Sequence, residues 1–237
     1  MKTLLVVGSS SDMGSKLIEK IKDNYDCVWA HFYGWNENMD RLKSINNGNI
    51  HFIEYNLTST EEVEKMINLI EESGNIPNNI VHFAMSKLCI NKFNKLSLEK
   101  MDMDWKICFD SIVMILQSFL PKMQKDKYGR IVFTLSSVTL GVPPKYEAGY
   151  VSIKYAMLGL MKSLAAEYGD KGIFVNGVSP DMVRTSFISD VPQLLVDQYA
   201  FEKPKKDILS VDDVIPTFVS LLSDDNELNG ENILIDQ

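Results

Sequence analysis

The sequence predicts an α/β fold in which a parallel sheet of about seven strands is covered by helices on both faces. Short apolar runs alternate with amphipathic segments along the chain, and a glycine turn follows the first run at once. Of the 237 residues, 45% are hydrophobic, which is enough for a full core. Alternation of this kind builds βαβ units, and right-handed crossovers wind them into a doubly wound sheet. We expect a single domain over residues 1–237, because no linker or repeat interrupts the pattern.

Seven apolar runs are the expected strands, and parallel strands buried on both faces have this near-continuous apolar character. They cover residues 4–7, 28–33, 50–55, 80–84, 131–135, 173–178 and 233–235. Some helix starts can be read between them. Ser59 with Glu62, and Ser210 with Asp213, have the spacing of a capping box, although Asp suits the closing position less well than Glu. Ser97 is expected to begin a long helix that runs to about residue 122.

The turn after the first run begins at Gly8 and ends at Gly14, where a helix starts. Strand, tight glycine turn and helix form the context of a dinucleotide-binding loop, which makes the expected fold Rossmann-like. The helix N-terminus would point unpaired N–H groups at a pyrophosphate. Ser9, Ser10 and Ser11 would add hydroxyl donors. An ordinary strand-to-helix turn favours the same residues, so this loop does not decide the function alone.

Tyr150 and Lys154 lie four residues apart, a spacing that places both side chains on one face of a helix. A lysine ammonium near a phenol favours the phenolate, so we expect Lys154 to lower the pKa of Tyr150 from about 10. Ser137, thirteen residues before Tyr150, follows an apolar run and would hold a substrate oxygen beside the phenol. These groups suit proton exchange with a carbinol oxygen during hydride transfer. Tyr and Lys at this spacing also occur by chance on amphipathic helices.

Together the two regions resemble the classical short-chain dehydrogenase/reductase family over essentially the whole chain, and in particular its 3-oxoacyl-thioester (acyl carrier protein) reductases. The resemblance implies that Ser137, Tyr150 and Lys154 are the catalytic set, without a departure. It implies no metal. The cofactor-binding residues that it implies are Gly8, Ser10, Ser11, Asp12, Met13, Gly14, Tyr33, Asn56, Leu57, Ala84, Tyr150, Lys154, Pro180, Val183 and Thr185.

The chain departs from the family pattern at several cofactor positions. Asp12 stands where the glycine loop has its middle glycine, and we expect it to cap the helix start. Ala84 is kept in the segment after the fourth strand, but Met85 replaces a glycine. Pro180 is kept after the sixth strand, and Asp181 replaces the glycine that follows it.

Another departure concerns the proton relay. The family places an asparagine in the long central helix, and Cys108 occupies that position here. Cysteine is a weak hydrogen-bonding group that often behaves as a small hydrophobe, so its catalytic role is doubtful. A shift of the alignment by one turn would bring Asp104 or Ser111 to the same place.

The segment 181–209 lacks a strand pattern. In the family this region covers the active site and helps to set substrate choice, so we expect a substrate lid. Two roles are open for its apolar residues, lining a pocket or packing a lid helix; they are Met182, Phe187, Ile188, Leu194, Leu195 and Phe201.

The end of the second expected strand indicates which nicotinamide binds. A carboxylate there would bond the adenosine ribose and select NAD. None stands before Glu37, so we expect NADP(H) rather than NAD(H). Arg41 is the only arginine nearby. Tyr33 and Asn36, with the loop serines, could bond a 2′-phosphate.

Composition excludes other classes. A net charge of −8 argues against nucleic-acid binding. Three cysteines without CxxC spacing indicate neither disulfides nor a zinc site. No stretch is long and apolar enough to span a bilayer, and no signal peptide is recognisable, so we expect a cytoplasmic protein. The basic cluster 203–206 is either a solvated loop or a contact for an acidic carrier or phosphate group.

The expected activity is reduction of a ketone, free or carrier-bound, to an alcohol by NAD(P)H with Tyr150 as proton donor. Asn176 and Thr185 would hold the nicotinamide. A non-catalytic cofactor-binding regulator or complex subunit is the alternative, and sugar epimerisation or dehydration, as in the extended branch of the superfamily, is a third. We also expect a homodimer or homotetramer, because the apolar residues of segment 152–168 go nearly all the way round the helix.

Overall fold

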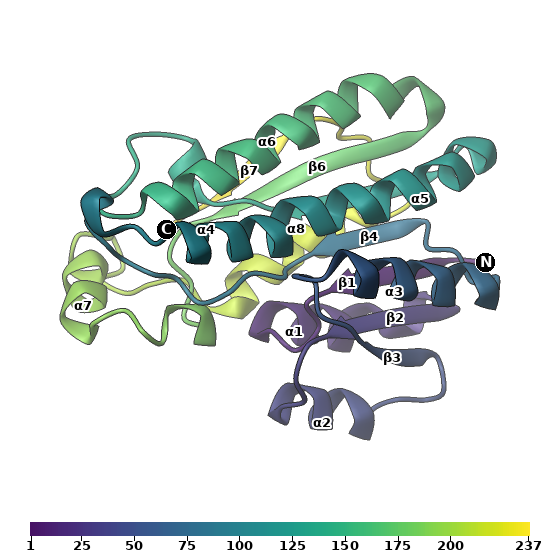
Figure 1. Cartoon of the computed structure of the whole chain (residues 1–237), viewed down its shortest axis with the longest axis horizontal. Coiled ribbons are helices and arrows are strands. Elements are labelled where there is room, and N and C mark those ends of the chain that lie inside the picture. Colours follow the sequence, from purple (N-terminus) through teal and green to yellow (C-terminus); the bar gives the residue numbers. More distant parts are fainter.

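The structure is a computed structural model that describes residues 1–237, and its centre is a seven-stranded parallel sheet (Figure 1). The strand order is β3-β2-β1-β4-β5-β6-β7. The order reverses between β1 and β4, and ligands of such sheets bind at this switch point, outside the carboxyl ends of the strands. The strands are β1 Thr3–Val7, β2 Cys27–Phe32, β3 Ile50–Glu54, β4 Asn79–His82, β5 Gly129–Thr134, β6 Ile173–Pro180 and β7 Asn232–Ile235.

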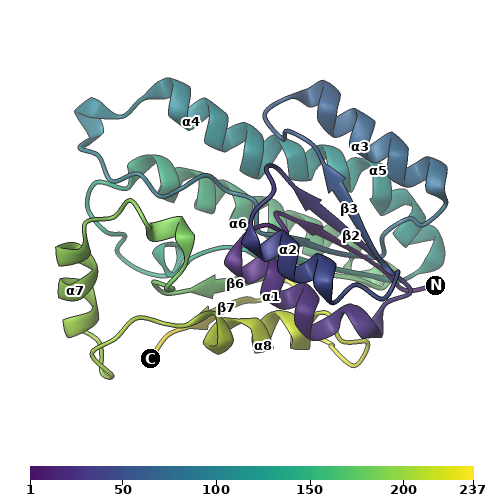
Figure 2. The same ribbon diagram turned by 90° about the horizontal axis from the view of Figure 1, so that it is seen from below.

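Helices cover both faces of the sheet, as Figure 2 shows edge-on. One face packs against α3, α5 and α6, and the other against α1, α2 and α8. The doubly wound fold that the alternation predicts is thereby confirmed. The helices are α1 Asp12–Ile21, α2 Glu37–Ser44, α3 Thr60–Ser73, α4 Leu98–Trp105, α5 Ser111–Asp126, α6 Ala148–Tyr168, α7 Gln193–Phe201 and α8 Val211–Leu221.

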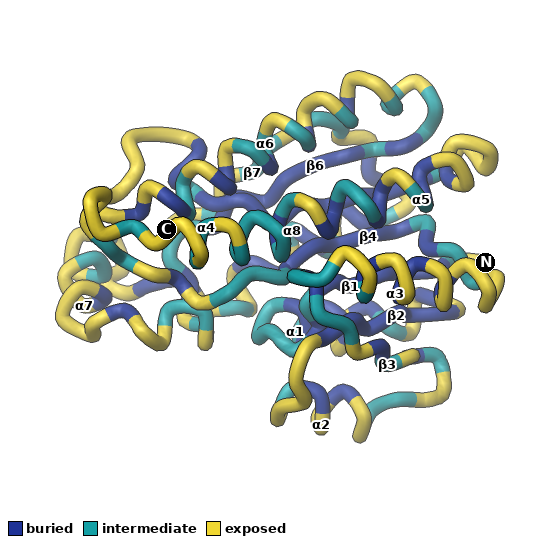
Figure 3. Tube along the Cα trace, in the orientation of Figure 1, coloured by how far each residue is buried: buried dark blue, intermediate teal, exposed yellow.

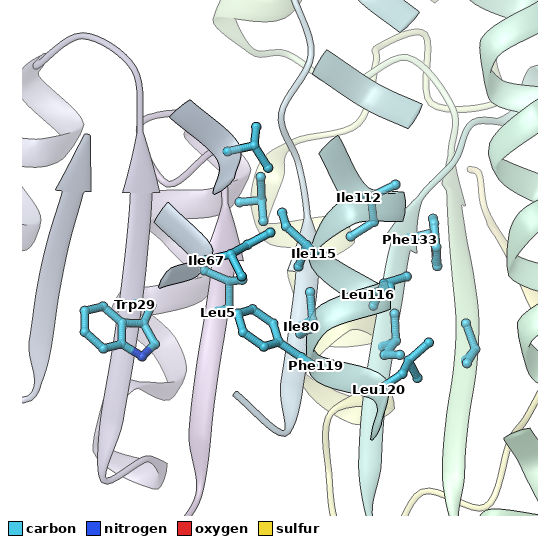
Figure 4. Close-up of a cluster of buried hydrophobic side chains, with 14 of the residues drawn as sticks. Leu5, Trp29, Ile67, Ile80, Ile112, Ile115, Leu116, Phe119, Leu120 and Phe133 are labelled. Carbon is cyan, nitrogen blue, oxygen red and sulfur yellow. The ribbon is translucent and has the colours of Figure 1, made fainter. Parts of the chain in front are cut away.

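The core consists of two apolar layers, one on each face of the sheet. The five inner strands are almost wholly buried, whereas the edge strands β3 and β7 and the outer helix faces are partly exposed (Figure 3). In the larger layer, Leu5, Ile80 and Phe133 project from the sheet toward side chains of α5, among them Ile115 and Phe119 (Figure 4). All five are fully buried or nearly so, and each such side chain stabilises the fold by about 1.5–3 kcal/mol. The core therefore holds the strand ends rigidly in place.

The expected strands match the observed ones to within about two residues, but the long helix differs. Ser97 caps α4 as predicted, accepting a hydrogen bond from Lys100 N. A π-helical turn, Lys106–Asp110, then separates α4 from α5. Of the two expected capping boxes, only that of Ser210 and Asp213 closes fully, because the Glu62 carboxylate turns to another backbone N–H.

The segment 181–209 lies beyond the carboxyl ends of the strands. Figures 1 and 2 show α7 at the end of the molecule opposite the N-terminus. A short 3₁₀ turn, Ser186–Ile188, precedes α7, and a single bridge joins Val183 to Leu209 at the base of the segment. The segment 181–209 therefore covers the edge of the sheet at which ligands of this fold bind.

Candidate active site

One cavity of about 700 Å³ opens at the carboxyl ends of the strands. It reaches from the glycine loop to the start of α6. Ser137, Tyr150 and Lys154 all line it, and of the cofactor positions expected from the sequence only Gly14 does not. Residues far apart in the chain are thus brought to one space, as the strand order requires.

The glycine loop is built around two close approaches. Gly8 has φ +90°, and a Cβ there would lie 2.7 Å from Ala84 N. A Cβ on Gly14 would lie 2.4 Å from Gly8 O, so only glycine lets α1 begin against the loop. Ser11 caps this helix by accepting a hydrogen bond from Gly14 N. The free N–H groups of the first turn therefore face the cavity end where an anion would bind.

His31 supports the glycine loop from β2, a role the sequence did not reveal. Its Nδ1 accepts a hydrogen bond from Gly8 N at 3.3 Å, and its Nε2 lies 3.0 Å from Tyr55 O. These partners require Nε2 to carry the proton. Burial lowers the pKa of His31 to about 4, so the ring is neutral and remains an acceptor for Gly8. The sequence does place a histidine near the end of the second expected strand. In the structure His31 pairs with Val7, the residue just before the glycine loop.

Asp12 does not cap α1, contrary to expectation, because Ser11 already holds that place. Its carboxylate turns to the segment 181–209 and accepts hydrogen bonds from Ser186 N at 2.7 Å and Ser186 Oγ at 2.8 Å. Asn38 Nδ2 is a third donor, at 3.2 Å. Partial burial works to raise the pKa of Asp12, but these hydrogen bonds outweigh it and lower the pKa. A negative charge therefore stands at the start of α1.

Tyr150 and Lys154 lie one turn apart on α6, as the spacing predicts. Lys154 is buried and donates a hydrogen bond from Nζ to Thr134 O at 2.8 Å, while Nζ lies 5.6 Å from the centroid of the Tyr150 ring. The expected lowering of the Tyr150 pKa is wrong for this structure. Burial raises that pKa, and only a hydrogen bond with Ser136 acts against the rise. Burial also lowers the pKa of Lys154.

Ser137 reaches the cavity, but its hydroxyl donates to Asp181 Oδ1 at 3.1 Å. Asp181 is the residue that replaces a family glycine. Its side chain is 9% exposed and is also bonded by Tyr199 and Lys203 from the segment 181–209. Burial works to raise the pKa of Asp181, yet these partners lower it, Lys203 foremost. Neither Ser136, which bonds Tyr150, nor Tyr199 was recognised from the sequence.

Cys108 lies in the π-helical turn, fully buried and outside the cavity lining. Its Sγ is 3.5 Å from Ala84 O. Burial raises the pKa of the Cys108 thiol to about 12, although Lys154 is near enough to oppose this. Of the two alternatives, Ser111 donates to Ile107 O and faces His82, whereas Asp104 is bonded to Ser86 and Lys100.

The segment 181–209 contributes to the cavity unevenly. Met182, Phe187 and Ile188 line it, and the Phe187 ring centroid is 5.8 Å from that of Tyr150. The other three apolar candidates, Leu194, Leu195 and Phe201, are exposed. Thr185 lines the cavity as expected.

Asn176 does not reach the cavity, so the expectation that it holds a nicotinamide is wrong. Its side chain is buried, with Nδ2 donating to Leu228 O at 2.7 Å and Oδ1 accepting from Glu231 N at 3.0 Å. It therefore anchors β6 to the loop before β7.

The far end of the cavity is formed by Tyr33, Asn36 and Asn56. Asn36 caps α2 and donates from Nδ2 to Ser10 O at 2.9 Å, which ties this end to the glycine loop. Arg41, on α2, is bonded to Asn38 Oδ1. Arg41 does not line the cavity itself but acts on Asp12, which does, and no carboxylate at the tip of β2 faces the cavity.

The cavity fits a dinucleotide. The close approach of Gly8 to Ala84, the free first turn of α1 and the length of the lining from Tyr33 to Tyr150 suit an extended phosphate-bearing ligand. The Asp12 carboxylate, at the start of α1, opposes the phosphates of such a ligand.

Fold and site together define a dinucleotide-binding α/β protein, and comparison with known proteins gives its family. A family model described as "Enoyl-(Acyl carrier protein) reductase" matches residues 30–237. The chain is 23% identical over 244 residues to the 3-oxoacyl-[acyl-carrier-protein] reductase FabG of Buchnera aphidicola subsp. Baizongia pistaciae, covering 98% of this chain and 94% of that protein. The chain belongs to the short-chain dehydrogenase/reductase family and is an NAD(P)-dependent oxidoreductase of it.

Solved structures agree on the fold. ElxO with NADP bound superposes with a TM-score of 0.86 at 25% identity, covering 99% of this chain and 97% of that one. The 4-hydroxyisoleucine dehydrogenase complexed with NADH superposes with a TM-score of 0.89 at 21% identity, covering 100% and 97%. In this chain, no helix has the length and apolarity to cross a membrane.

Proposed function

We propose that the protein reduces a ketone to an alcohol with NADPH, and that Tyr150 donates the proton. The observation that carries this proposal is the meeting of Tyr150, Lys154 and the glycine loop in one cavity. A bound reduced nicotinamide supplies the hydride. The carbonyl carbon gains that hydride, the carbonyl oxygen takes the Tyr150 proton, and a proton from solvent restores the phenol. The ketone is reduced and NADPH becomes NADP⁺.

The state of each side chain supports these roles. Burial raises the pKa of Tyr150, so the phenol keeps its proton at neutral pH and is able to donate it. Lys154, fixed by Thr134 O, supplies the charge that stabilises the phenolate once the proton has left. Ser136 bonds the phenol, and Ser137 stands where a substrate oxygen would need a donor.

The test is oxidation of NADPH by purified protein with a panel of ketones, followed by cofactor fluorescence. Tyr150→Phe should bind NADPH as before but lose turnover by about a hundredfold to ten-thousandfold, the usual contribution of a general acid. Tyr155→Phe is the matched control, since Tyr155 lies on the same helix but is 45% exposed. A fully active Tyr150→Phe variant would show that Tyr150 is not the proton donor.

We further propose that NADP(H) is preferred over NAD(H). Arg41 is bonded to Asn38 and is near enough to Asp12, at the start of α1, to act on the pKa of that carboxyl. Arg41→Met should weaken NADPH binding by about tenfold, equivalent to 1.4 kcal/mol, and leave NADH binding nearly unchanged. An equal loss of affinity for both cofactors, measured by fluorescence titration, would show that Arg41 does not bind a 2′-phosphate.

We infer that residues 181–209 form the lid over the substrate. Met182, Phe187 and Ile188 of this segment line the cavity beside Tyr150 and supply apolar surface. The relatives named 3-oxoacyl-[acyl-carrier-protein] reductase support a carrier-bound ketone as one substrate class. Of the basic cluster, Lys203 is bonded to Asp181 inside the molecule, which leaves Lys205 and Lys206 for an acidic carrier.

One observation favours a non-catalytic, cofactor-binding role as a second candidate. The Ser137 hydroxyl has a single proton, and it points at Asp181. A serine held in this way is not free to polarise a carbonyl. NADPH binding without oxidation by any ketone, unchanged in Tyr150→Phe, would support this second role.

A further inference from the structure

Glu147 is a carboxylate that the reaction described above does not use. It immediately precedes α6, three residues before Tyr150, and lines the cavity. Only 9% of the residue is exposed. Its side chain does not cap the helix, and that side chain makes no hydrogen bond or ion pair with the rest of the chain. Neither carboxylate oxygen is among the fully buried side-chain atoms that lack a partner, so the carboxylate opens to the cavity. Partial burial raises the pKa of Glu147, and a cation placed beside it would favour the ionised form.

The other charged groups around the cavity all have partners within the chain. Asp12 is bonded by Ser186, and Asp181 by Lys203. Lys154 donates to Thr134 O, and Lys87 pairs with Asp190 at 3.0 Å. The chain therefore offers Glu147 no cation, and a cationic group that enters the cavity would be its first partner.

Glu147 is also close to the reacting group. Glu147 is the N-cap residue of α6, Tyr150 lies in the first turn of that helix, and both line the same cavity. The charge of Glu147 acts on Tyr150, where it contributes to raising the pKa of the phenol. A ligand group that meets Glu147 while a carbonyl oxygen meets Tyr150 must therefore be separated from that carbonyl by only a few bonds.

We propose that Glu147 determines substrate choice by binding an ammonium group a few bonds from the ketone that is reduced. The substrate class is a short amino ketone. An apolar acyl chain would leave the carboxylate buried and unpaired, so long-chain 3-oxoacyl thioesters are disfavoured. This inference rests on the proposed ketone reduction, but the binding of a cationic product analogue tests it without turnover.

The kinetic test compares isosteric ketones, beginning with aminoacetone against butanone and continuing with longer spacers. At least one ammonium ketone should exceed its alkyl isostere in kcat/KM by about tenfold or more, which corresponds to 1.4 kcal/mol. Glu147→Gln should bring that ratio to about one, and the readout is the ratio of the two ketones within each variant, because loss of the charge also acts on Tyr150 and so on both rates. Glu167→Gln, at an exposed acid of the same helix, is the control and should keep the ratio. A ratio of one or below for every spacer in the unaltered protein, or a ratio that survives Glu147→Gln, overturns the proposal.

The binding test uses isopropanolamine and its uncharged isostere sec-butanol, titrated into the full chain with NADPH and observed by NMR. The cation should bind the unaltered protein more tightly than the alcohol by about tenfold, and Glu147→Gln should remove the difference. Equal binding of both by the unaltered protein overturns the role of Glu147. Selective binding of the cation without ketone turnover retains the ammonium site and removes the reductase function instead.

Discussion

Tyr150 shows how a residue's role depends on its surroundings as well as on spacing. The interval to Lys154 predicts a shared helix face, which α6 provides. It also suggests a lowered phenol pKa, whereas burial raises it and Lys154 donates its hydrogen bond to Thr134 O. Sequence spacing gives direction along a helix but not the loss of water around a side chain, and that loss dominates here.

Asp12 carries the clearest prediction at the residue scale. Its ionised carboxylate stands at the start of α1, where a pyrophosphate would bind, and two such charges at about 4 Å repel by about 1 kcal/mol or more. Asp12→Asn should therefore bind NADPH about tenfold more tightly in a fluorescence titration. Glu19→Gln, the same change in charge further along α1, should leave the affinity unchanged. Weaker binding by Asp12→Asn would mean that the contact with Ser186 is needed to shape the site.

At the scale of elements, β2 supports the glycine loop through His31. The neutral ring accepts from Gly8 N, and burial lowers the pKa of His31 to about 4, below the ordinary 6.5. The unfolded chain therefore binds more protons than the folded one between these values, and stability is lost as pH falls from about 6.5 toward 4. Titration of His31 should lower the free energy of unfolding by about 2 kcal/mol between pH 7 and pH 5.

Urea unfolding at several pH values measures how the free energy of unfolding changes with pH. His31→Asn retains an acceptor for Gly8 N without a titrating ring, so its stability should fall less than that of the unaltered protein over this range. His51→Asn, at an exposed position of β3, should follow the unaltered protein. Parallel pH curves for all three proteins would show that His31 is not the titrating group.

The elements themselves were largely predictable, and the site only in part. Apolar runs located all seven strands because burial on both faces imposes a continuous apolar pattern. The π-helical turn at Cys108 was not predicted, since it leaves no propensity signal. Asn176 was misplaced because the motif fixes its position on β6 but not which face its side chain takes. The pairing of Asp181 with Lys203 depends on how the segment 181–209 folds back, which no local pattern encodes.

On the scale of the whole molecule, assembly remains a prediction. Met157 and Met161 of α6 are buried within the monomer, which accounts for part of the apolar pattern that suggested an oligomer. The outward face of α6 carries Tyr155 and Gly159, and Gly159 has open space around it. The exposed Tyr155 ring and the open space at Gly159 make this face the place where we expect a second copy to pack.

Sedimentation velocity should show a homodimer or homotetramer. Gly159→Arg should shift the protein toward monomer without unfolding it, because a side chain there meets nothing in the monomer. Glu64→Arg, on the exposed face of α3, should sediment as the unaltered protein does. A monomer at all concentrations would remove the prediction.

The central claim is that hydride passes to a ketone in the cavity that Tyr150 and the glycine loop share. The most direct measurement is incubation with NADPH that carries deuterium at both C4 positions and a reducible ketone, followed by mass spectrometry of the alcohol. We expect deuterium on the carbinol carbon with unaltered protein, and a rate at least about a hundredfold lower with Tyr150→Phe. Bound NADPH with no labelled alcohol, or equal labelling by Tyr150→Phe, would contradict it.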